Sequence, residues 1–463
     1  MSYGDTATVV QDLRAHFGER ISTAEAIRRH HGEDLSYLPT MLPDAVVFVE
    51  STAEVQRVVA ACAKARVPIV PYGVGSSMEG QILAAAGGVS LDMSRMTRIV
   101  AVHESDFDVV VEPGVTRKSL NEHLRHTGLT FPVDPGADAS IGGMASTRAS
   151  GTNAVRYGTM RENVLALEVV LANGEILRTG SRARKSSMGY DLTKLFVGAE
   201  GTLGVLTEIT LRLHPVPAAI SAAVCPFDSL NGAVDTCIAT IQSGVPIARI
   251  EFLDDIAIQA SNSYSKMNLV VAPTLFLEFH GTEAGIREQA EIVEAIAAEN
   301  GGRGFQWATQ REERERLWKA RHDSNPATRA MRPGAAMFVT DACVPISALA
   351  DNMAAARADA DASFLKFKIN GHVGDGNFHV AYLVMPDAQD EIAEAKRLAE
   401  NVVMRALESG GTASGEHGVG LGKLKYMRRE HGYGVEVMRS LKQALDPHAI
   451  MNPGKLGMSA EAA

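Results

Sequence analysis

Three glycine-rich segments in the N-terminal half constrain this chain more than any other feature. They read "PYGVGSSMEGQ" at 71–81, "DPGADASIGGMASTRASGTNAVRYG" at 134–158 and "FVGAEGTLGVLTEITL" at 196–211. Closely spaced glycines let a backbone turn sharply and present several N–H groups to one anion. Long segments without structure of their own are uncommon in compact domains unless they have a function. Together, the three segments predict a backbone that packs against a large, flat ligand carrying phosphates.

The first segment alone does not carry that prediction. Its spacing fits neither the GxGxxG dinucleotide fingerprint nor the GxxxxGK[ST] phosphate loop. A glycine-rich turn without a ligand explains it equally well. The prediction therefore depends on all three segments occurring in one domain.

The sequence around these segments predicts an α/β unit. "AVVFVE" from Ala45 is typical of a strand, and "VPIVPYGVG" is typical of a second strand. The residues between them predict a helix whose start is capped by Ser51 and Glu54 in a capping box. Further on, Asn173-Gly174 lies between two apolar runs and predicts a hairpin turn.

The second half has a different pattern. Strands such as "TLFLEFHG" alternate with amphipathic helices such as "EIAEAKRLAENVVMRALES", which predicts an α+β domain with an antiparallel sheet. Pro215 and Pro217 indicate a boundary near residue 217. We therefore expect a helical N-terminal arm at 1–37, one domain at 38–217 and another at 218–463.

Composition narrows the class of protein. The chain has 463 residues, a formal net charge of −10 and 22% charged residues, so nucleic acid is not expected as its main partner. Its four cysteines form no CxxC pair, which argues against an iron–sulfur or zinc-finger motif. No apolar segment approaches the roughly 20 residues of a membrane span, and the N-terminus lacks the apolar core of a secretory signal. We expect a cytoplasmic protein, either free or peripheral to the inner membrane.

Two loops in the second half carry candidate metal ligands. "NGHVGDGNFH" at 370–379 predicts a strand, a tight turn and a second strand, with His372 and His379 on either side of the turn. "GGTASGEHGVGLGK" at 410–423 contains Glu416 followed by His417. Two histidines and one carboxylate are a common ligand set of catalytic metal sites. From the residues alone, a histidine placed as His379 is more often a hydrogen-bonded core residue, and a carboxylate placed as Glu416 is most often solvated.

The three glycine-rich segments, in this order, resemble the FAD-binding domain of the vanillyl-alcohol oxidase (PCMH-type) flavoproteins over about residues 40 to 217. The resemblance implies a two-subdomain FAD-binding domain and a cap domain with an antiparallel sheet, an α+β architecture. The first loop, "YGVGSS", has no histidine for a covalent flavin link, so non-covalent FAD is expected. The residues that the resemblance assigns to FAD are Pro71, Gly73, Val74, Gly75, Ser76, Ser77, Met78, Pro135, Gly136, Ser140, Ile141, Gly142, Gly143, Ser146, Thr147, Gly151, Thr152, Asn153, Ala154, Tyr157, Glu200, Gly201, Gly204, Val205 and Asn452.

"GHVGDGNFH" and "SGEHGVG" resemble signatures of one branch of that family, the FAD-dependent D-2-hydroxyacid dehydrogenases. The resemblance implies that His372, His379 and Glu416 bind a divalent metal, with zinc as first choice and Mn²⁺ or Fe²⁺ as alternatives. It also implies that His417 is the general base. The closing "LDPHAIMNPGK" resembles the family's end, so the last 40 or so residues, with Asn452, are expected to return to the flavin.

The branch implies oxidation of a D-2-hydroxy acid to the 2-keto acid, with hydride transfer to flavin N5. Arg321, with Asn325 one helical turn later, is the candidate for binding the substrate carboxylate. Met337 and Val339 are apolar on the next strand, where relatives with a dicarboxylic substrate have a lysine, so D-lactate is favoured. The electron acceptor is expected to be external: a cytochrome, a quinone-linked or other electron-transfer protein, or oxygen. A homodimer is expected.

Three alternatives remain open. The chain could be the catalytic subunit of a glycolate oxidase complex or a D-2-hydroxyglutarate dehydrogenase. From a different class, a zinc-dependent hydrolase would use the same ligands to activate water, but it would leave the glycine-rich segments unexplained.

Overall fold

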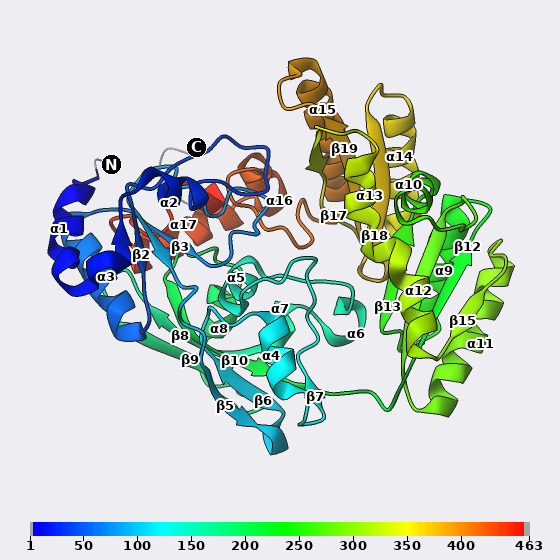
Figure 1. Cartoon of the computed structure of the whole chain (residues 1–463), viewed down its shortest axis with the longest axis horizontal. Helices are drawn as coiled ribbons and strands as arrows, with labels where there is room; N and C mark the ends of the chain where they lie inside the picture. The colour runs from blue at the N-terminus through cyan, green and yellow to red at the C-terminus, as the bar shows by residue number, and fades with distance from the viewer. Residues whose placement is uncertain (1–2, 458–463) are drawn as a thin grey trace. The chain divides into compact units, whose positions relative to one another are not determined.

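The computed structural model describes residues 3–457 and divides the chain into two compact units (Figure 1). Unit 1 contains Met1–Ser150, Gly158–Val216 and Glu416–Ala463, and unit 2 contains Gly151–Tyr157 and Pro217–Gly415. The chain therefore enters unit 2 twice. The short segment Gly151–Tyr157 is part of unit 2, although unit 1 lies on both sides of it in the sequence.

The first sheet of unit 1 has the strand order β1-β2-β4-β3. Its strands are β1 (Ile21–Ser22), β2 (Ala45–Phe48), β3 (Ile69–Tyr72) and β4 (Val89–Asp92). Strands β2, β4 and β3 are parallel, which requires a crossover, and α3 (Thr52–Ala65) provides it. The helices α1 (Thr6–Phe17) and α2 (Glu25–His30) precede α3 in the sequence. Buried Val9, Leu13 and Phe17 of α1 join the same core as Val55 and Val59 of α3.

The predicted cap of α3 forms only in part. Ser51 accepts a hydrogen bond from the N–H of Glu54. Among residues 3–457, the Glu54 carboxylate accepts from the N–H of Glu50 at 2.8 Å and from Arg20, but not from the N–H of Ser51. The Arg20 guanidinium holds the carboxylate away from the position that a full capping box needs.

The second sheet of unit 1 is antiparallel, with the order β5-β6-β10-β8-β9. Its strands are β5 (Ile99–His103), β6 (Asp108–Val111), β8 (Val164–Val170), β9 (Ile176–Gly180) and β10 (Val205–Arg212). The predicted turn at Asn173-Gly174 joins β8 to β9. Besides short 3-10 turns, the described part of this unit also contains α4 (Arg117–Leu124), β7 (Leu129–Thr130), α5 (Ile141–Thr147), α7 (Met160–Asn163), α8 (Leu192–Phe196), β11 (His214–Pro215), α16 (Met427–His431) and α17 (Gly434–Leu445).

Unit 2 is built on one antiparallel sheet of order β15-β12-β14-β13-β18-β19-β16, with β17 paired to β19. Its strands are β12 (Ala219–Pro226), β13 (Arg249–Leu253), β14 (Thr274–Gly281), β15 (Gln306–Ala308), β16 (Ala336–Val339), β17 (Ala342–Cys343), β18 (Lys366–His372) and β19 (Asn377–Val384). This sheet confirms the predicted α+β architecture. The predicted strand, turn and strand are β18, the turn at residues 373–376, and β19.

Helices cover both faces of this sheet. One face packs on α9 (Leu230–Gln242), α11 (Glu283–Glu299), α14 (Leu349–Asp361) and α15 (Gln389–Glu408), and the other on α10 (Asp255–Ser265) and α12 (Arg311–His322), with α13 (Ser324–Ala330) against α10. Side chains alternate between the faces of a strand. Ile250, Phe252 and Ile369 join the larger core, so Glu251 and His372 point to the opposite face.

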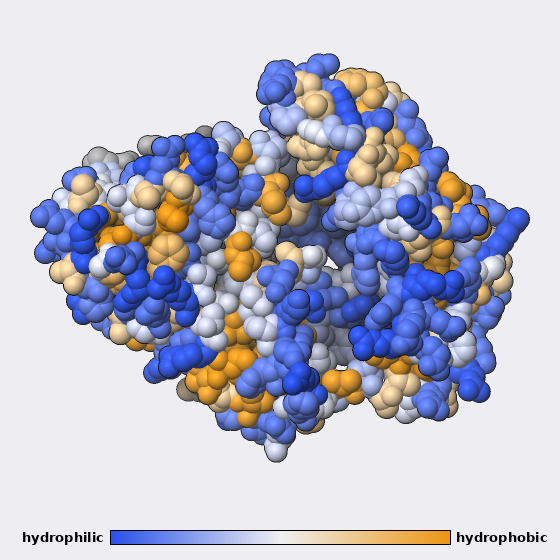
Figure 2. Space-filling view, in the orientation of Figure 1, coloured by the Kyte–Doolittle hydropathy of each residue, from blue (hydrophilic) through white to orange (hydrophobic). Residues whose placement is uncertain are grey.

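Hydrophilic side chains cover most of the face seen in Figure 2, with hydrophobic residues scattered singly or in small groups. Among residues 3–457, no helix combines the length and the apolar character needed to cross a bilayer.

Candidate active site

The first two glycine-rich segments meet in unit 1. The loop after β3 approaches the start of α5 so closely that a Cβ on Gly73 would overlap the hydroxyl of Ser140. Gly75 in the same loop has φ +71°, a conformation that favours glycine. Ser140 is 1% exposed, and its hydroxyl has no hydrogen-bond partner among residues 3–457. A buried hydroxyl of this kind normally has a partner, so a ligand atom beside it would complete its hydrogen bonding.

The third segment and the C-terminal loop meet at the same place. The N–H of Glu200 donates to the carbonyl of Ser146 at 2.9 Å, and a Cβ on Gly201 would lie 2.9 Å from the ring of Pro71. The amide of Asn452 donates to the carbonyls of Gln81 at 2.9 Å and Glu200 at 2.7 Å. Within the described part of the chain, Oδ1 of Asn452 has no partner. Four distant stretches of sequence thus form one cradle in unit 1.

Most residues that the sequence assigned to the cofactor lie in this cradle. Val74, Ser76, Ser77 and Met78 follow in the loop after β3, and Pro135 and Gly136 precede α5. Ile141, Gly142, Gly143, Ser146 and Thr147 form α5, and Gly204 and Val205 begin β10. Position 204 requires glycine, because a Cβ there would lie 2.6 Å from the side chain of Val169.

Five residues of the predicted set belong instead to unit 2: Gly151, Thr152, Asn153, Ala154 and Tyr157. Side chains of the unit 2 sheet hold this segment. Arg249 donates to Oδ1 of Asn153 at 2.9 Å, and the hydroxyl of Tyr157 lies 2.7 Å from Nδ1 of His280. The predicted cofactor set is therefore divided between the two units.

The two predicted metal-ligand histidines lie side by side on the sheet of unit 2. The rings of His372 and His379 are nearly perpendicular, with centroids 5.6 Å apart. Nδ1 of His379 lies 2.9 Å from the carbonyl of Thr340, and Nδ1 of His372 lies 2.7 Å from the carboxylate of Glu251. Because a carbonyl and an ionised carboxylate only accept, both rings carry their proton on Nδ1 when neutral. The ring lone pair is then on Nε2, the arrangement found in metal-binding histidines.

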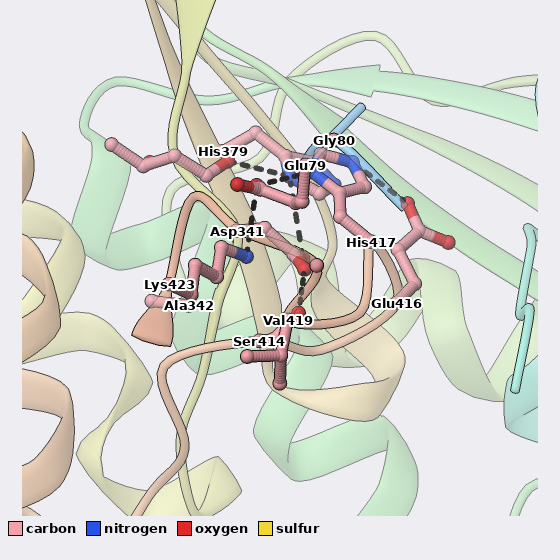
Figure 3. A network of polar contacts seen from close by, with 12 residues as sticks. Glu79, Gly80, Asp341, Ala342, His379, Ser414, Glu416, His417, Val419 and Lys423 are labelled. Atoms are coloured by element: carbon pink, nitrogen blue, oxygen red, sulfur yellow. Dashed lines mark hydrogen bonds and ion pairs between the residues drawn. The ribbon is translucent and has the colours of Figure 1, made fainter. Parts of the chain in front are cut away.

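Asp341 links His379 to the loop that leads to Glu416 (Figure 3). Its carboxylate lies 3.8 Å from Nδ1 of His379 and accepts from Asn377 at 2.9 Å and Ser414 at 2.9 Å. The N–H of Gly415 donates to the Asp341 carbonyl at 3.1 Å. Gly415 is the last residue of unit 2, and Glu416, the third predicted ligand, is the first residue of unit 1 after it.

In unit 1, the loop that begins at Glu416 surrounds buried polar groups. The carboxylate of Glu200 accepts from the N–H groups of Val419 at 2.7 Å and Gly420 at 2.8 Å. Burial raises the pKa of Glu200, and these two hydrogen bonds oppose the rise. The carbonyl of His417 accepts from Gln81 at 2.7 Å.

The side chain of His417, the predicted general base, lies among charged groups of unit 1 (Figure 3). Its Nδ1 is 3.9 Å from the carboxylate of Glu79, which also pairs with Lys423 at 3.3 Å. Its Nε2 is 4.0 Å from the carboxylate of Glu416.

Arg321 points to the same sheet face as His372. Its Nε and Nη2 donate to one oxygen of Glu251 at 2.8 and 2.7 Å. Burial alone would raise the pKa of Glu251, but the charges and hydrogen bonds of His372 and Arg321 outweigh burial and lower it.

Arg321 and Asn325 do not share a helix, which corrects the expectation from the sequence. Helix α12 ends at His322 and α13 begins at Ser324. The break has a local cause, because Pro326 cannot donate to the carbonyl of His322 and its ring would clash with that carbonyl in a continuous helix.

Lys368 is a candidate functional residue that the sequence reasoning missed. It is 1% exposed, and its ammonium donates to Ser324 at 2.7 Å and to Oδ1 of Asn325 at 3.0 Å. Burial and the nearby charge of Arg321 lower the pKa of Lys368 to about 7. The bond to Oδ1 turns the amide nitrogen of Asn325 away from the lysine.

Glu251 and Asp341 were missed as well. A signal for both was available, because each is an acidic residue inside or beside an apolar strand: "ARIEFL" for Glu251 and "MFVTDAC" for Asp341. Lys368 lies four residues before His372, so strand alternation alone places the two side chains on one face.

Comparison with known proteins defines the class. A model described as "FAD linked oxidases, C-terminal domain" matches residues 216–456, and one described as "FAD binding domain" matches residues 43–180. The chain therefore belongs to the FAD-linked oxidase family, and the predicted flavoprotein oxidoreductase class is confirmed. Two features of the cradle fit FAD. Its backbone segments lie so close together that glycine is needed, and the buried Ser140 and Asn452 have polar atoms without a hydrogen-bond partner among residues 3–457.

Within that family, the chain is similar to D-lactate dehydrogenases. It is 51% identical to the probable mitochondrial D-lactate dehydrogenase of Danio rerio, over 97% of this chain and 91% of that protein. It is 47% identical to the mitochondrial D-lactate dehydrogenase [cytochrome] of Arabidopsis thaliana, over 97% and 80% of the two chains. The solved 4-ethylphenol oxidase of Gulosibacter chungangensis shares the fold, with a TM-score of 0.79 at 18% identity over 99% of both chains.

Proposed function

We propose that this protein oxidises a D-2-hydroxy acid, with D-lactate favoured, to the 2-keto acid and passes the electrons to an external acceptor. One structural observation carries the proposal. On the same face of the unit 2 sheet, a single carboxylate, Glu251, holds both a guanidinium and a histidine whose Nε2 carries the lone pair. A 2-hydroxy acid can use both kinds of group, one for its carboxylate and one for a metal beside its hydroxyl. The names of the two relatives support the same substrate.

The residues have separate roles in this proposal. Arg321 binds the substrate carboxylate, and the Asn325 amide, oriented by Lys368, is a second donor to it. His417 accepts the hydroxyl proton, a role suited to an imidazole with carboxylates beside it. FAD, when bound in the unit 1 cradle, supplies the hydride acceptor. The protein itself supplies orientation and charge.

His372, His379 and Glu416 would hold a divalent metal, with zinc as first choice. Covalent geometry supports the choice of Glu416 as third ligand, because trans peptide units keep its Cα about 3.8 Å from that of Gly415. Gly415 is itself hydrogen-bonded to Asp341, whose carboxylate lies 3.8 Å from His379. A metal ion at these ligands would lower the pKa of the substrate hydroxyl.

The substrate's size, the electron acceptor and the location are also part of the proposal. Met337 and Val339 favour a substrate without a second carboxylate, and Lys368 already donates to Ser324 and Asn325. A cytochrome is the first-choice acceptor, because one relative is named for it. Both relatives are named mitochondrial, so the cytoplasmic location stays a prediction, as do the homodimer and the non-covalent flavin.

An anaerobic absorbance titration tests the proposal. The purified protein should show flavin bands that bleach with D-lactate and not with L-lactate, and release intact FAD on acid precipitation. Dialysis against a chelator should abolish bleaching while leaving the flavin bands, and zinc or manganese should restore it. Comparable turnover of D-2-hydroxyglutarate or glycolate would refute the choice of substrate. A protein that does not retain added FAD would refute the function, and a colourless preparation that hydrolyses its substrate would favour the hydrolase.

A further inference from the structure

Glu251 is fixed at the centre of the unit 2 sheet. Its strand, β13, pairs with β14 at Glu251 itself and with β18 at the next two residues, Phe252 and Leu253. The side chain is 1% exposed. Strand alternation directs it to the face of His372, away from the larger core.

The two oxygens of Glu251 serve two different partners. One lies 2.7 Å from Nδ1 of His372, and the other accepts from Nε and Nη2 of Arg321 at 2.8 and 2.7 Å. The first contact sets the histidine tautomer and the ring orientation. The second uses one edge of the guanidinium and directs the opposite edge away from the carboxylate.

We propose that Glu251 is a positioning residue that couples the substrate-binding arginine to a metal-binding histidine. The proposal rests on the proposed function. It adds that the site for the substrate carboxylate and the site for the metal depend on the same residue. Because one rigid carboxylate orients both side chains, loss of that carboxylate disturbs the carboxylate site and the metal site together. Arg321 and His372 need no direct contact for this coupling.

Replacement by glutamine makes the coupling testable, because an amide offers one acceptor and one donor. If its oxygen faces His372, its NH₂ faces the Arg321 guanidinium, donor against donor. If its oxygen faces Arg321, its NH₂ forces the proton of His372 onto Nε2, the atom that would bind the metal. Loss of the negative charge also leaves the Arg321 cation uncompensated in a buried place. Either orientation disturbs one partner directly and the other through the charge.

Unit 2 contains a matched control for Glu251. Glu278 on the neighbouring strand β14 is also buried on this face and contacts His280 at 2.7 Å and Arg249 at 3.5 Å. Glu278→Gln therefore removes a carboxylate in the same kind of histidine–arginine setting. Because neither His280 nor Arg249 is a predicted metal ligand, this variant should bind metal as the wild type does.

The experiment uses the full-length, FAD-loaded protein and measures zinc affinity by chelator competition and KM for D-lactate. Glu251→Gln should lower zinc affinity about 10- to 100-fold, the usual effect of losing such a partner of a metal ligand. The same variant should raise KM about ten-fold or more, because a charged hydrogen bond to the substrate is weakened. Arg321→Lys should raise KM and leave zinc affinity within two-fold, because a lysine can still pair with Glu251 and His372 keeps its partner.

A readout that needs no metal completes the design. Nitrogen NMR of the metal-free protein should report His372 with its proton on Nδ1, and Glu251→Gln should shift that tautomer. If Glu251→Gln folds poorly, Glu251→Gln with Arg321→Met removes the uncompensated cation and should still bind zinc weakly.

The outcomes separate the two proposals. A change in zinc affinity or KM alone, or in neither, would overturn the coupling while leaving the proposed function in place. A wild-type protein that binds no zinc, manganese or iron would overturn the proposed metal site together with the coupling. A joint loss in Glu251→Gln, with zinc binding intact in Glu278→Gln, supports the coupling.

Discussion

Lys442 offers a sharp test of how unit 1 holds the loop that carries Asn452. Its ammonium is buried near the end of α17 and donates to three groups: the Asp446 carboxylate at 2.5 Å, the Thr202 carbonyl at 2.6 Å and the Met451 carbonyl at 2.8 Å. The perturbation is Lys442→Met, which keeps the length of the side chain and removes its charge and its donors.

The expected loss of stability follows from the groups left behind. Asp446 is 1% exposed, so its charge would be buried without a counter-charge. The N–H groups of Ile450 and Met451 would still donate to it, which reduces the cost. Breaking a buried ion pair by removing one partner costs about 3–5 kcal/mol. Two carbonyls also lose a donor, so the upper part of that range is expected.

The same change should weaken FAD binding. The loop from Asp446 to Met451 leads directly to Asn452, whose amide bonds to Gln81 and Glu200 place it in the cradle. When Met451 loses its bond to Lys442, this placement loses its nearest support. FAD should then dissociate more readily, although Lys442 itself is not a predicted FAD ligand.

The assay measures urea unfolding by the fluorescence of released FAD, together with hydrogen exchange in α17, on the full-length protein. Gln443→Met introduces the same residue at the adjacent exposed position and should change stability by less than about 0.5 kcal/mol. Lys442→Met with Asp446→Asn should recover part of the loss, because no charge is left buried. The reasoning would be refuted if Lys442→Met kept its free energy of unfolding within about 0.5 kcal/mol of wild type and retained FAD equally well.

Three further predictions concern single residues. Ser140→Ala should raise the melting temperature of the FAD-free protein, because it removes a buried hydroxyl that has no partner among residues 3–457. The same change should lower the affinity for FAD. A variant that binds FAD as tightly as wild type in an equilibrium titration would contradict this prediction. Burial lowers the pKa of His214 to about 4, so the unfolded chain binds the proton more readily below about pH 6.5 and stability is lost as pH falls toward 4. His214→Gln should lose less stability than wild type between pH 7 and pH 4.5 in thermal scans. Gly376→Ala should destabilise unit 2 by about 2–4 kcal/mol, since φ is +76° and a Cβ would overlap the Val344 carbonyl; hydrogen exchange of β18 and β19 measures it.

Local sequence signals predicted the elements well where they did not depend on distant partners. The glycine turn between His372 and His379, the hairpin at Asn173-Gly174 and the antiparallel sheet all follow from short-range patterns. The capping box forms only in part, because the Glu54 carboxylate accepts a hydrogen bond from Arg20, which lies 34 residues away in the sequence. No local pattern reports such a competitor.

The candidate site shows the same limit. Alternation along β18 was sufficient to place Lys368 and His372 on one face. It could not show that Lys368 would donate to Asn325, because that contact depends on how α13 packs above the sheet. The sequence predicted ligands and missed their supporting partners, since a supporting partner is defined by contact with an element that is distant in the sequence.

The clearest example is the choice among the histidines of the unit 2 sheet. His280, His372 and His379 all lie on buried strands, and composition does not separate them. His280 has Nδ1 at 2.7 Å from the Tyr157 hydroxyl and Nε2 at 2.7 Å from the Glu278 carboxylate, so protein groups engage both of its ring nitrogens. Protein groups hold Nδ1 of the other two, which directs the ring lone pair to Nε2. Hydrogen bonds at both ring nitrogens, which the position of the residue in a strand does not reveal, exclude His280 as a candidate ligand.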